Sequence, residues 1–338
     1  MILRERVTAL LEAMRHRRIV VVGDAMLDIY LIGDVERISP EAPVPVVTVH
    51  ERRYALGGAA NVAANAAAIG ADVTLVAAVG DDQRGEQLRT ELAASGIRDE
   101  GVLTVSDRPT TSKTRVVARS QQLVRIDEEE NAILDGNAVG DLAHRLQRAL
   151  KHADAVLLED YNKGVLAPQI IESALRLARS RGVPSVVDPK YRQFFDYKGA
   201  TVFKPNRREL EAALGAAVDL EHADALPAVM ARLEVDNLLL TLGPQGMALV
   251  DNRGAITRLS TQAREVYDVS GAGDTVTAWV GTALAAGATM AEAAELANYA
   301  AGIEVGKAGV AVVSPEEVLN LYERRYDEVG LFRRGGVL

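Results

Sequence analysis

The stretch that decides the fold reads D-V-S-G-A-G-D-T-V, residues 268–276, where a glycine-rich turn runs directly into a helix of small and apolar residues. Backbone N–H groups at a helix start are unpaired and lie at the positive end of the helix dipole, and glycines let an anion approach the main chain closely. The turn therefore predicts a phosphate site. Asp274 is expected to take a proton from a hydroxyl there, although an aspartate that only complements the dipole is the commoner case.

Working outward from this turn, short apolar strands alternate with helices along most of the chain. Helices are expected at 57–70, after Asp81 and Asp82, at 137–151, 168–181, 207–214, 273–286 and 290–305, and after Ser314 and Pro315. Strands are expected at 19–22, 73–79, 155–158, 185–187, 201–203, 237–241 and 247–250. Such alternation is typical of a mostly parallel sheet with helices on both faces. The sequence therefore predicts the α/β class and a single domain over residues 1–338.

Two segments break this alternation. Residues 31–54 carry Pro40, Pro43 and Pro45 among valines, which suits an edge or projecting strand better than a central one. Residues 110–126 also have the pattern of extended strands. Together they predict a small β-sheet lid, at about 31–55 and 106–126, inserted in the main fold.

The composition narrows the classes of function. The chain has no cysteine, so disulfides, thiolate catalysis and cysteine-ligated metals are excluded. Its five histidines are scattered without a metal-ligand spacing, so any metal is expected to be held by oxygen. The formal net charge of −9 argues against a nucleic-acid partner. No apolar run approaches the ~20 residues of a membrane span. The N-terminal segment alternates apolar and charged residues, which indicates an amphipathic helix and not a signal peptide. We expect a cytoplasmic protein with no membrane partner.

The common nucleotide-binding motifs are missing. There is no G-x-x-x-x-G-K-[ST] and no H-R-D or D-F-G set. A G-x-G-x-x-G reading of Gly271 and Gly273 fails because Val276 stands where the third glycine belongs. A Rossmann dehydrogenase is disfavoured for that reason, and because the glycine-rich turn lies near the C-terminus. What remains is a different phosphotransfer architecture.

Two segments resemble the signatures of the PfkB sugar kinases. They are G-G-A-A-N-V-A at 57–63 and D-V-S-G-A-G-D at 268–274. The resemblance implies a ribokinase-like three-layer αβα sandwich and ATP-dependent phosphorylation of a sugar hydroxyl. It implies that Asp274 is the catalytic base and that the N–H groups of Gly271, Ala272 and Gly273 form an anion hole. Relatives pair their lids, so a homodimer through the lid is also implied.

The same resemblance implies a set of residues for the nucleotide and its ions. Asn206 and Glu209 match the N-x-x-E motif that organises Mg²⁺, through water for Glu209, and the ATP phosphates; a helix capping box is the alternative explanation of that pair. The adenine-side loop and its neighbour are matched by Thr241, Gly243, Gly246 and Asn298. A buried asparagine bonded to main chain would explain Asn298 equally well. Asp268 resembles the aspartate of a monovalent-cation site, which implies K⁺.

Five further stretches resemble one subgroup, the heptose 7-phosphate kinases of ADP-heptose synthesis. They are residues 23–28, 37–46, 112–118, 121–123 and 160–164. The implied substrate is D-glycero-β-D-manno-heptose 7-phosphate, phosphorylated to the 1,7-bisphosphate. The implied substrate residues are Asp28, Gly57, Gly58, Asn61, Asp160, Lys163, Asp188, Lys190 and Arg115. The candidates for the 7-phosphate are Lys163, Lys190, Lys113, Arg115 and Arg119, and Lys163 and Lys190 are favoured because they follow strand ends. Any one lid cation could instead be a solvated strand edge.

Three departures from the subgroup surround the substrate region. Glu159 stands where a small residue is expected, Tyr191 and Arg192 replace a glycine after D-P-K, and Lys204 replaces a common threonine. Another sugar or sugar phosphate, of the ribose or fructose type, therefore stays open, as does a catalytically silent sugar-binding protein. Many heptose kinases are fused to a nucleotidyltransferase with an H-x-G-H motif, and this sequence is expected to hold the kinase unit alone.

Overall fold

A computed structural model describes residues 2–334 apart from 120, 221, 223, 264 and 265. Eight strands form its central sheet in the order β14-β13-β12-β11-β10-β9-β1-β4. They are β1 Arg18–Gly23, β4 Asp72–Val76, β9 Ala155–Glu159, β10 Ser185–Asp188, β11 Val202–Phe203, β12 Asn237–Thr241, β13 Met247–Val250 and β14 Ile256–Leu259. The strands from β4 to β12 run parallel, and β13 and β14 are antiparallel additions at one edge.

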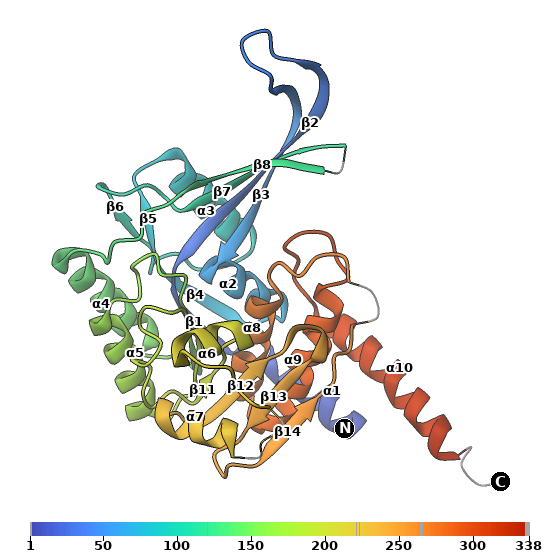
Figure 1. Ribbon diagram of the computed structural model, residues 1–338. Coiled ribbons are helices and arrows are strands. Elements are labelled where there is room, and N and C mark those ends of the chain that lie inside the picture. Colours follow the sequence, from blue (N-terminus) through green and yellow to red (C-terminus); the bar gives the residue numbers. More distant parts are fainter. Residues whose placement is uncertain (1, 120, 221, 223, 264–265, 335–338) are drawn as a thin grey trace.

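Helices cover both faces of this sheet (Figure 1). One face carries α1 Arg4–Met14, α2 Ala59–Ala68, α8 Ala272–Ala285, α9 Met290–Glu304 and α10 Pro315–Arg334; the other carries α4 Gly136–Leu150, α5 Pro168–Arg181, α6 Arg207–Leu214 and α7 Ala225–Leu233. Successive residues of β1 alternate between two hydrophobic clusters: Ile19 and Val21 face the first set of helices, Val20 and Val22 the second. The expected three-layer α/β architecture is confirmed.

A second sheet stands off the body of the molecule (Figure 1). Its order is β3-β2-β7-β8, from β2 Ala25–Ile38, β3 Pro45–Gly58, β7 Ser112–Ala118 and β8 Gln121–Glu128. We call these four strands the lid sheet. As expected from the prolines, β3 lies at an edge. The expected bounds of 31–55 were too short, because pairing continues down to Ala25 with Gly58 and carries the strands to the main sheet.

Some elements differ from the sequence predictions. Gly57 and Gly58 end β3 and do not begin the helix, because Gly58 has a φ of +56° that does not fit a right-handed helix. The expected strand 73–79 is two strands, since β5 Ala78–Gly80 leaves the main sheet and pairs with β6 Leu103–Val105. The short elements β6, β14 and α7 were not predicted, and a 3₁₀ turn covers Gly243–Gln245.

The remaining helices lie close to their expected bounds. Asp82 caps α3 Gln83–Ala94 by accepting a hydrogen bond from the Gly85 N–H. The helix after the glycine-rich turn begins at Ala272, within one residue of the predicted start. Among the residues that the structure describes, no helix combines the length and apolarity needed to cross a membrane.

Candidate active site

The site lies where the parallel strands end. Glu159 closes β9, Asp188 closes β10, and Lys204 follows β11 directly. The carboxyl ends of parallel strands meet at one edge of a sheet, which is where ligands of open α/β sheets bind. The start of α8 comes to the same edge and brings Asp274 within reach of these side chains.

Asp274 is buried, with 5% of its surface exposed, and both carboxylate oxygens accept hydrogen bonds. Asn61 Nδ2 donates to Oδ2 at 2.7 Å and the Tyr161 hydroxyl donates to Oδ1 at 3.0 Å. Burial raises the pKa of Asp274 to about 6; Asp188 adds to the rise, while the two hydrogen bonds oppose it. A carboxyl with this pKa is ionised at neutral pH and is a better base than an exposed aspartate.

The turn before Asp274 is built for an anion. Gly271 caps α8 with a φ of +96°, a conformation that side chains with a Cβ rarely adopt. A Cβ there would also lie only 3.0 Å from Asn61 Nδ2. No described side chain caps this helix start, and the Ala272 N–H makes only a 3.5 Å contact with the Val269 carbonyl. The N–H groups of the turn are therefore open to a phosphate at the positive end of the helix dipole.

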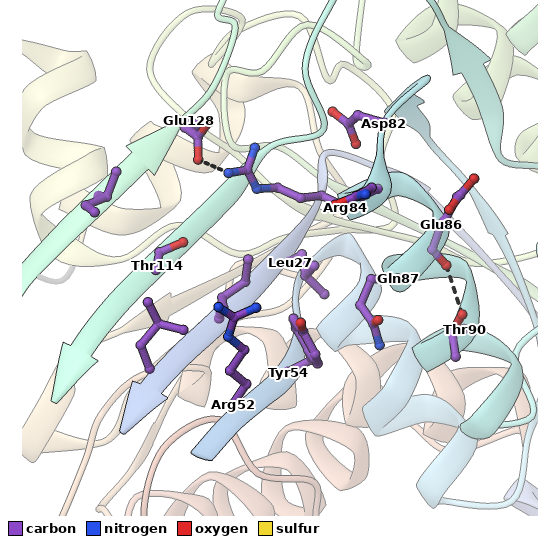
Figure 2. Close-up of a pocket in the computed structure, with 14 residues that line it drawn as sticks. Leu27, Arg52, Tyr54, Asp82, Arg84, Glu86, Gln87, Thr90, Thr114 and Glu128 are labelled. Carbon is purple, nitrogen blue, oxygen red and sulfur yellow. Dashed lines mark hydrogen bonds and ion pairs between the residues drawn. The ribbon is translucent and has the colours of Figure 1, made fainter. Parts of the chain in front are cut away.

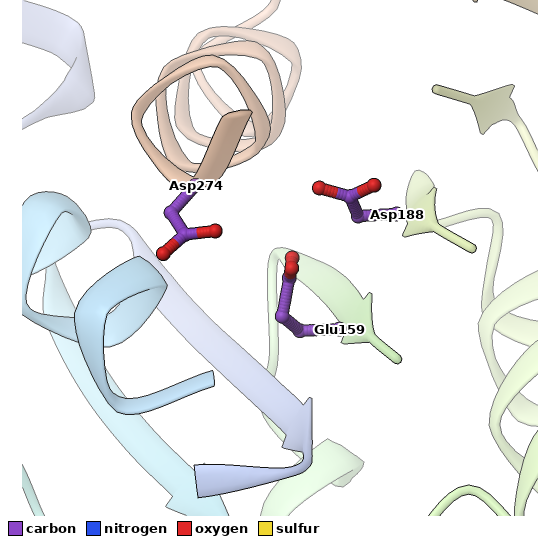
Figure 3. Close-up of side chains that lie close together, drawn as sticks. All are labelled: Glu159, Asp188 and Asp274. Atoms are coloured by element: carbon purple, nitrogen blue, oxygen red, sulfur yellow. The ribbon is translucent and has the colours of Figure 1, made fainter. Parts of the chain in front are cut away.

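Three carboxylates meet at this point. Ligand oxygens of Glu159, Asp188 and Asp274 all lie within 4.8 Å of one another. Figure 3 shows Glu159 pointing toward the space between the other two. Glu159 is fully buried, and neither of its oxygens has a hydrogen-bond partner among the residues that the structure describes. Burial, and then the negative charge of Asp188, raise the pKa of Glu159 well above its ordinary value.

The cation of this cluster is Lys204. Its side chain is 2% exposed and its Nζ lies 2.7 Å from Asp188 Oδ2. Burial lowers the pKa of Lys204, but Asp188 and Glu159 outweigh that effect and raise it above the ordinary value. The ammonium therefore stays charged within the cluster.

The loop after β9 is held by a buried carboxylate that the sequence analysis did not assign. Asp24 accepts hydrogen bonds from three backbone N–H groups, of Tyr161 at 2.8 Å, Lys163 at 2.9 Å and Val165 at 3.0 Å. The predicted substrate residue Asp160 lies in this loop, where its oxygens accept from the Tyr197 hydroxyl and the Asn162 N–H. Asp160 therefore has structural partners, and the loop presents Tyr161 to Asp274.

The N-x-x-E pair forms the capping box. Asn206 Oδ1 accepts from the Glu209 N–H, and Glu209 Oε2 accepts from the Asn206 N–H, each at 2.9 Å. Glu209 Oε1 also forms an ion pair with Lys190, whose ammonium lies 4.9 Å from the centre of the Tyr161 ring. The motif thus starts α6 and links its first turn to the residues around Asp274.

Most of the predicted nucleotide residues line one cavity. A space of about 360 Å³ beside the start of α8 is bounded by Asn206, Thr241, Gly243, Gly246, Ala272, Gly273 and Asn298, with apolar residues of α9. Glu209 is outside this lining. Asn298 Nδ2 donates to the Ser260 carbonyl at 2.7 Å, as the main-chain explanation predicts, and its contact with the nucleotide stays a prediction.

Several of the predicted substrate residues form ion pairs with other side chains, and Arg119 is exposed to solvent. Asp28 is buried beside Gly57 and forms an ion pair with Arg115 at 2.6 Å. Lys163 pairs with Glu129 at 2.7 Å. Arg119 is exposed at the turn between β7 and β8. The structure thus brings Asp28 and Arg115 together, while Lys163 and Lys190 each already have a carboxylate partner.

Glu304 is another buried carboxylate, next to Gly271 of the turn. In the described part of the chain neither of its oxygens has a hydrogen-bond partner, and burial, followed by the charges of Asp268 and Asp274, raises its pKa to about 8. Asp268 Oδ1 accepts from the Ser270 N–H at 2.9 Å. Asp268 and Glu304 are oxygen donors of the kind that a cation requires.

Comparison with known proteins identifies the family. The family described as pfkB family carbohydrate kinase matches residues 16–317. The chain belongs to this family. It is therefore an ATP-dependent carbohydrate kinase, and the sequence resemblance to PfkB kinases is confirmed.

The curated relatives of this PfkB kinase are longer than the chain. "Bifunctional protein HldE" of Pelobacter propionicus is 43% identical over 319 residues, which cover 94% of this chain and 65% of the relative. The protein of the same name from Paramagnetospirillum magneticum is 44% identical over 313 residues, which cover 91% and 64%. The chain thus spans just under two thirds of the relatives it matches.

Solved structures confirm the ribokinase-like fold. Arabidopsis thaliana ribokinase complexed with ribose and ATP has a TM-score of 0.70 at 23% identity, covering 90% of this chain and 98% of that one. Escherichia coli phosphofructokinase-2 in complex with potassium has a TM-score of 0.74 at 19% identity, covering 91% and 99%. At these identities the likeness establishes the fold of this PfkB kinase.

Sequence reasoning missed several residues of the site. Tyr161 lies within the stretch 160–164 that resembles the heptose kinases but received no role, although its hydroxyl donates to Asp274 Oδ1 in the structure. Glu159 and Lys204 were noted only as departures from the subgroup, and that departure was the available signal. Glu304 gave no signal, because no recognised motif surrounds this acid at the end of the predicted helix 290–305.

Proposed function

We propose that this PfkB kinase transfers the γ-phosphoryl group of ATP to the anomeric hydroxyl of D-glycero-β-D-manno-heptose 7-phosphate in the cytoplasm, giving the 1,7-bisphosphate and ADP. The observation that carries the transfer is Asp274, a buried carboxyl with a pKa of about 6 in the first turn of a helix whose N–H groups can receive a phosphate. The five stretches that resemble heptose 7-phosphate kinases support the choice of sugar.

In the proposed step, Asp274 accepts the proton of the attacking hydroxyl. The sugar oxygen forms a bond to the γ-phosphorus, the bond from that phosphorus to the bridging oxygen breaks, and ADP leaves with its electron pair. The N–H groups at Gly271, Ala272 and Gly273 bind the transferring group, because charge develops on its oxygens. Asn61 and Tyr161 hold the Asp274 carboxylate in position for the hydroxyl.

The nucleotide is proposed to occupy the cavity beside α8. Its lining combines apolar residues for the base with Asn206 and Gly273 near the phosphate end. Glu209 retains lone pairs for water beyond its bonds to Asn206 and Lys190, which fits Mg²⁺ bound through water. When bound, Mg²⁺ neutralises phosphate charge. Asp268 is proposed for K⁺, with Glu304 as a neighbouring oxygen donor.

The sugar is proposed to lie below the lid sheet. Asp28, Gly58 and Asn61 would take its hydroxyls, since Asp28 and Asn61 are buried polar side chains near the site. Arg115 is proposed for the 7-phosphate. Its guanidinium contacts Asp28 and the ring of Tyr30, so it is held in place before the substrate arrives.

We also propose that two copies pair through their lid sheets. The face of β2 opposite Asp28 carries Leu27 and Ile29, which line an open hollow of about 850 Å³ between the lid sheet and α3 (Figure 2). Val124 and Ile126 of β8 are exposed, and a second copy would cover such apolar side chains. Light scattering at micromolar concentration should give a dimer, and a monomer would contradict this assignment.

The sugar is tested by ADP release with ATP and Mg²⁺. The panel contains the heptose 7-phosphate, ribose, fructose and fructose 6-phosphate, each run in parallel on Asp274→Asn. Turnover of the heptose phosphate alone, lost in the variant, supports the proposal. Turnover of another sugar keeps the kinase and refutes the heptose assignment. Silence across the panel together with failure to bind ATP would favour a non-catalytic sugar-binding protein.

A further inference from the structure

The ammonium of Lys204 lies beside the anion-binding turn. The Lys204 N–H donates to the Val187 carbonyl at 2.8 Å, which fixes the residue next to β10. A Cβ built on Gly273 would lie 3.5 Å from Lys204 Nζ and 3.6 Å from Asp188 Oδ2. The ammonium is therefore next to the first turn of α8, where the transferred phosphoryl group is proposed to bind.

Asp188 and Glu159 favour the Lys204 ammonium, but the helix start and the burial oppose a lysine at this place. The positive end of a helix dipole repels a cation, and taking an ammonium out of water is expensive even when a carboxylate pairs with it. Lys204 is nevertheless almost completely buried and pairs with Asp188. An ammonium has three N–H donors, and one contact with Asp188 leaves donors for another anion.

We propose that Lys204 is a further catalytic residue, whose ammonium contacts the oxygens of the γ-phosphoryl group during transfer from ATP to the sugar. This inference rests on the proposed function. No proton leaves Lys204 in the step: the hydroxyl proton goes to Asp274, and the bond changes are those already described. The ammonium balances negative charge on the transferring group and on the leaving ADP.

The other nearby cations are less suited to this task. Lys190 pairs with Glu209 and lies over the Tyr161 ring, and Arg115 pairs with Asp28 on the lid sheet. The carboxylates of Glu159, Asp188 and Asp274 could in principle surround a metal ion (Figure 3). The Lys204 ammonium is already in contact with Asp188 in this cluster, so it supplies the positive charge that a metal would bring.

Glu159 belongs to the electrostatic environment of Lys204. Its carboxyl raises the lysine's pKa, and its oxygens have no hydrogen-bond partner among the residues that the structure describes. Both residues depart from the heptose-kinase pattern, and the fold brings the two departures to the same edge of the sheet, on either side of β10.

The test uses Lys204→Met, Glu159→Gln and the double variant, with Lys198→Met as the matched control. Lys198 forms an exposed pair with Glu234. We expect Lys204→Met to lower kcat by about 10²–10³-fold, with the KM for ATP changed by less than about threefold. The double variant removes one carboxyl together with the ammonium. Because fewer buried carboxylates are then left without a cation, this variant should fold more readily than Lys204→Met, and its kcat should stay low. Recovery of kcat in the double variant would mean that Lys204 only balances Glu159, and would overturn the proposal.

A binding measurement separates this inference from the choice of sugar. Calorimetric titration with Mg²⁺ and either ADP or ADP with aluminium fluoride, a mimic of the transferring phosphoryl group, needs no sugar. Lys204→Met, or the double variant if the single one does not fold, should weaken binding of the mimic at least about tenfold and leave ADP affinity unchanged. Equal affinities of variant and control for the mimic would refute the role of Lys204, whichever sugar is turned over.

Discussion

Replacing Asp274 with asparagine is expected to slow phosphoryl transfer strongly and at the same time to stabilise the fold at neutral and alkaline pH. The substitution keeps the shape of the side chain and removes its charge. Asparagine can still accept a hydrogen bond from Asn61 through its oxygen, and the Tyr161 hydroxyl can turn to accept from the new amide. The fold should therefore survive while the base is lost.

The size of the stability effect follows from the pKa of Asp274. Burial raises this pKa from 3.8 to about 6. At about 1.4 kcal/mol for each tenfold change in acidity, ionising the carboxyl is about 3 kcal/mol less favourable in the folded chain than in the unfolded one. The folded state binds the proton more tightly, so wild-type stability falls as pH rises from about 4 through about 6. Asp274→Asn has no carboxyl to ionise at this position, so its stability does not fall in this way.

Urea unfolding and ADP release together check the reasoning. We expect Asp274→Asn to be about 1–3 kcal/mol more stable than wild type near pH 8, with the gap closing toward pH 4. Its kcat should fall by about 10²–10⁴-fold, the range of general-base contributions. The wild-type kcat/KM should fall below a pH of about 6 as Asp274 takes up a proton. A variant less stable than wild type near pH 8, or one that keeps more than about a tenth of kcat, would refute the account.

Three further substitutions test the parts around the base. Asp24→Asn replaces one carboxylate oxygen with an NH₂ group, which faces backbone N–H donors of the loop after β9 and cannot accept from them. The free energy of unfolding in urea should fall by about 1–3 kcal/mol, and a fall below about 0.5 kcal/mol would contradict the anchoring role of Asp24. Asn298→Ala removes the donor to Ser260 in the nucleotide cavity and should raise the KM for ATP about fivefold without changing that for the sugar, whereas the reverse pattern would displace the nucleotide. Arg115→Met breaks the pair with Asp28 and should raise the KM for the sugar phosphate roughly 10–100-fold; an unchanged KM would remove Arg115 from the phosphate site.

Much of the site could be predicted because its motifs are local. The capping box of Asn206 and Glu209 involves two residues only three positions apart in the chain. The sequence pattern therefore indicates it directly. The glycine-rich turn into α8 is local for the same reason. The lid strands were found but begun too late, because the alternation of Ala25 to Asp28 is hidden by burial on both sides near the main sheet.

Basic residues were the least predictable part. Lys163 and Lys190 were favoured for the substrate phosphate because each follows a strand end, and the structure gives each a carboxylate partner. Those partners come from segments that the strand-end argument does not consider. The substrate roles of both lysines therefore stay predictions.

By itself the sequence determined where most of the helices begin, which strands are buried, and that an acid lies inside an anion-binding turn. These properties depend on neighbours a few residues away, through periodicity, capping and glycine conformation. The tertiary structure decided what surrounds Asp274. Asn61 and Tyr161, which hold it, are 213 and 113 positions away, and Glu159, Asp188 and Lys204 meet there because β9, β10 and β11 are neighbours in the sheet. Burial among these groups sets the pKa of Asp274, and burial is a property of the assembled layers.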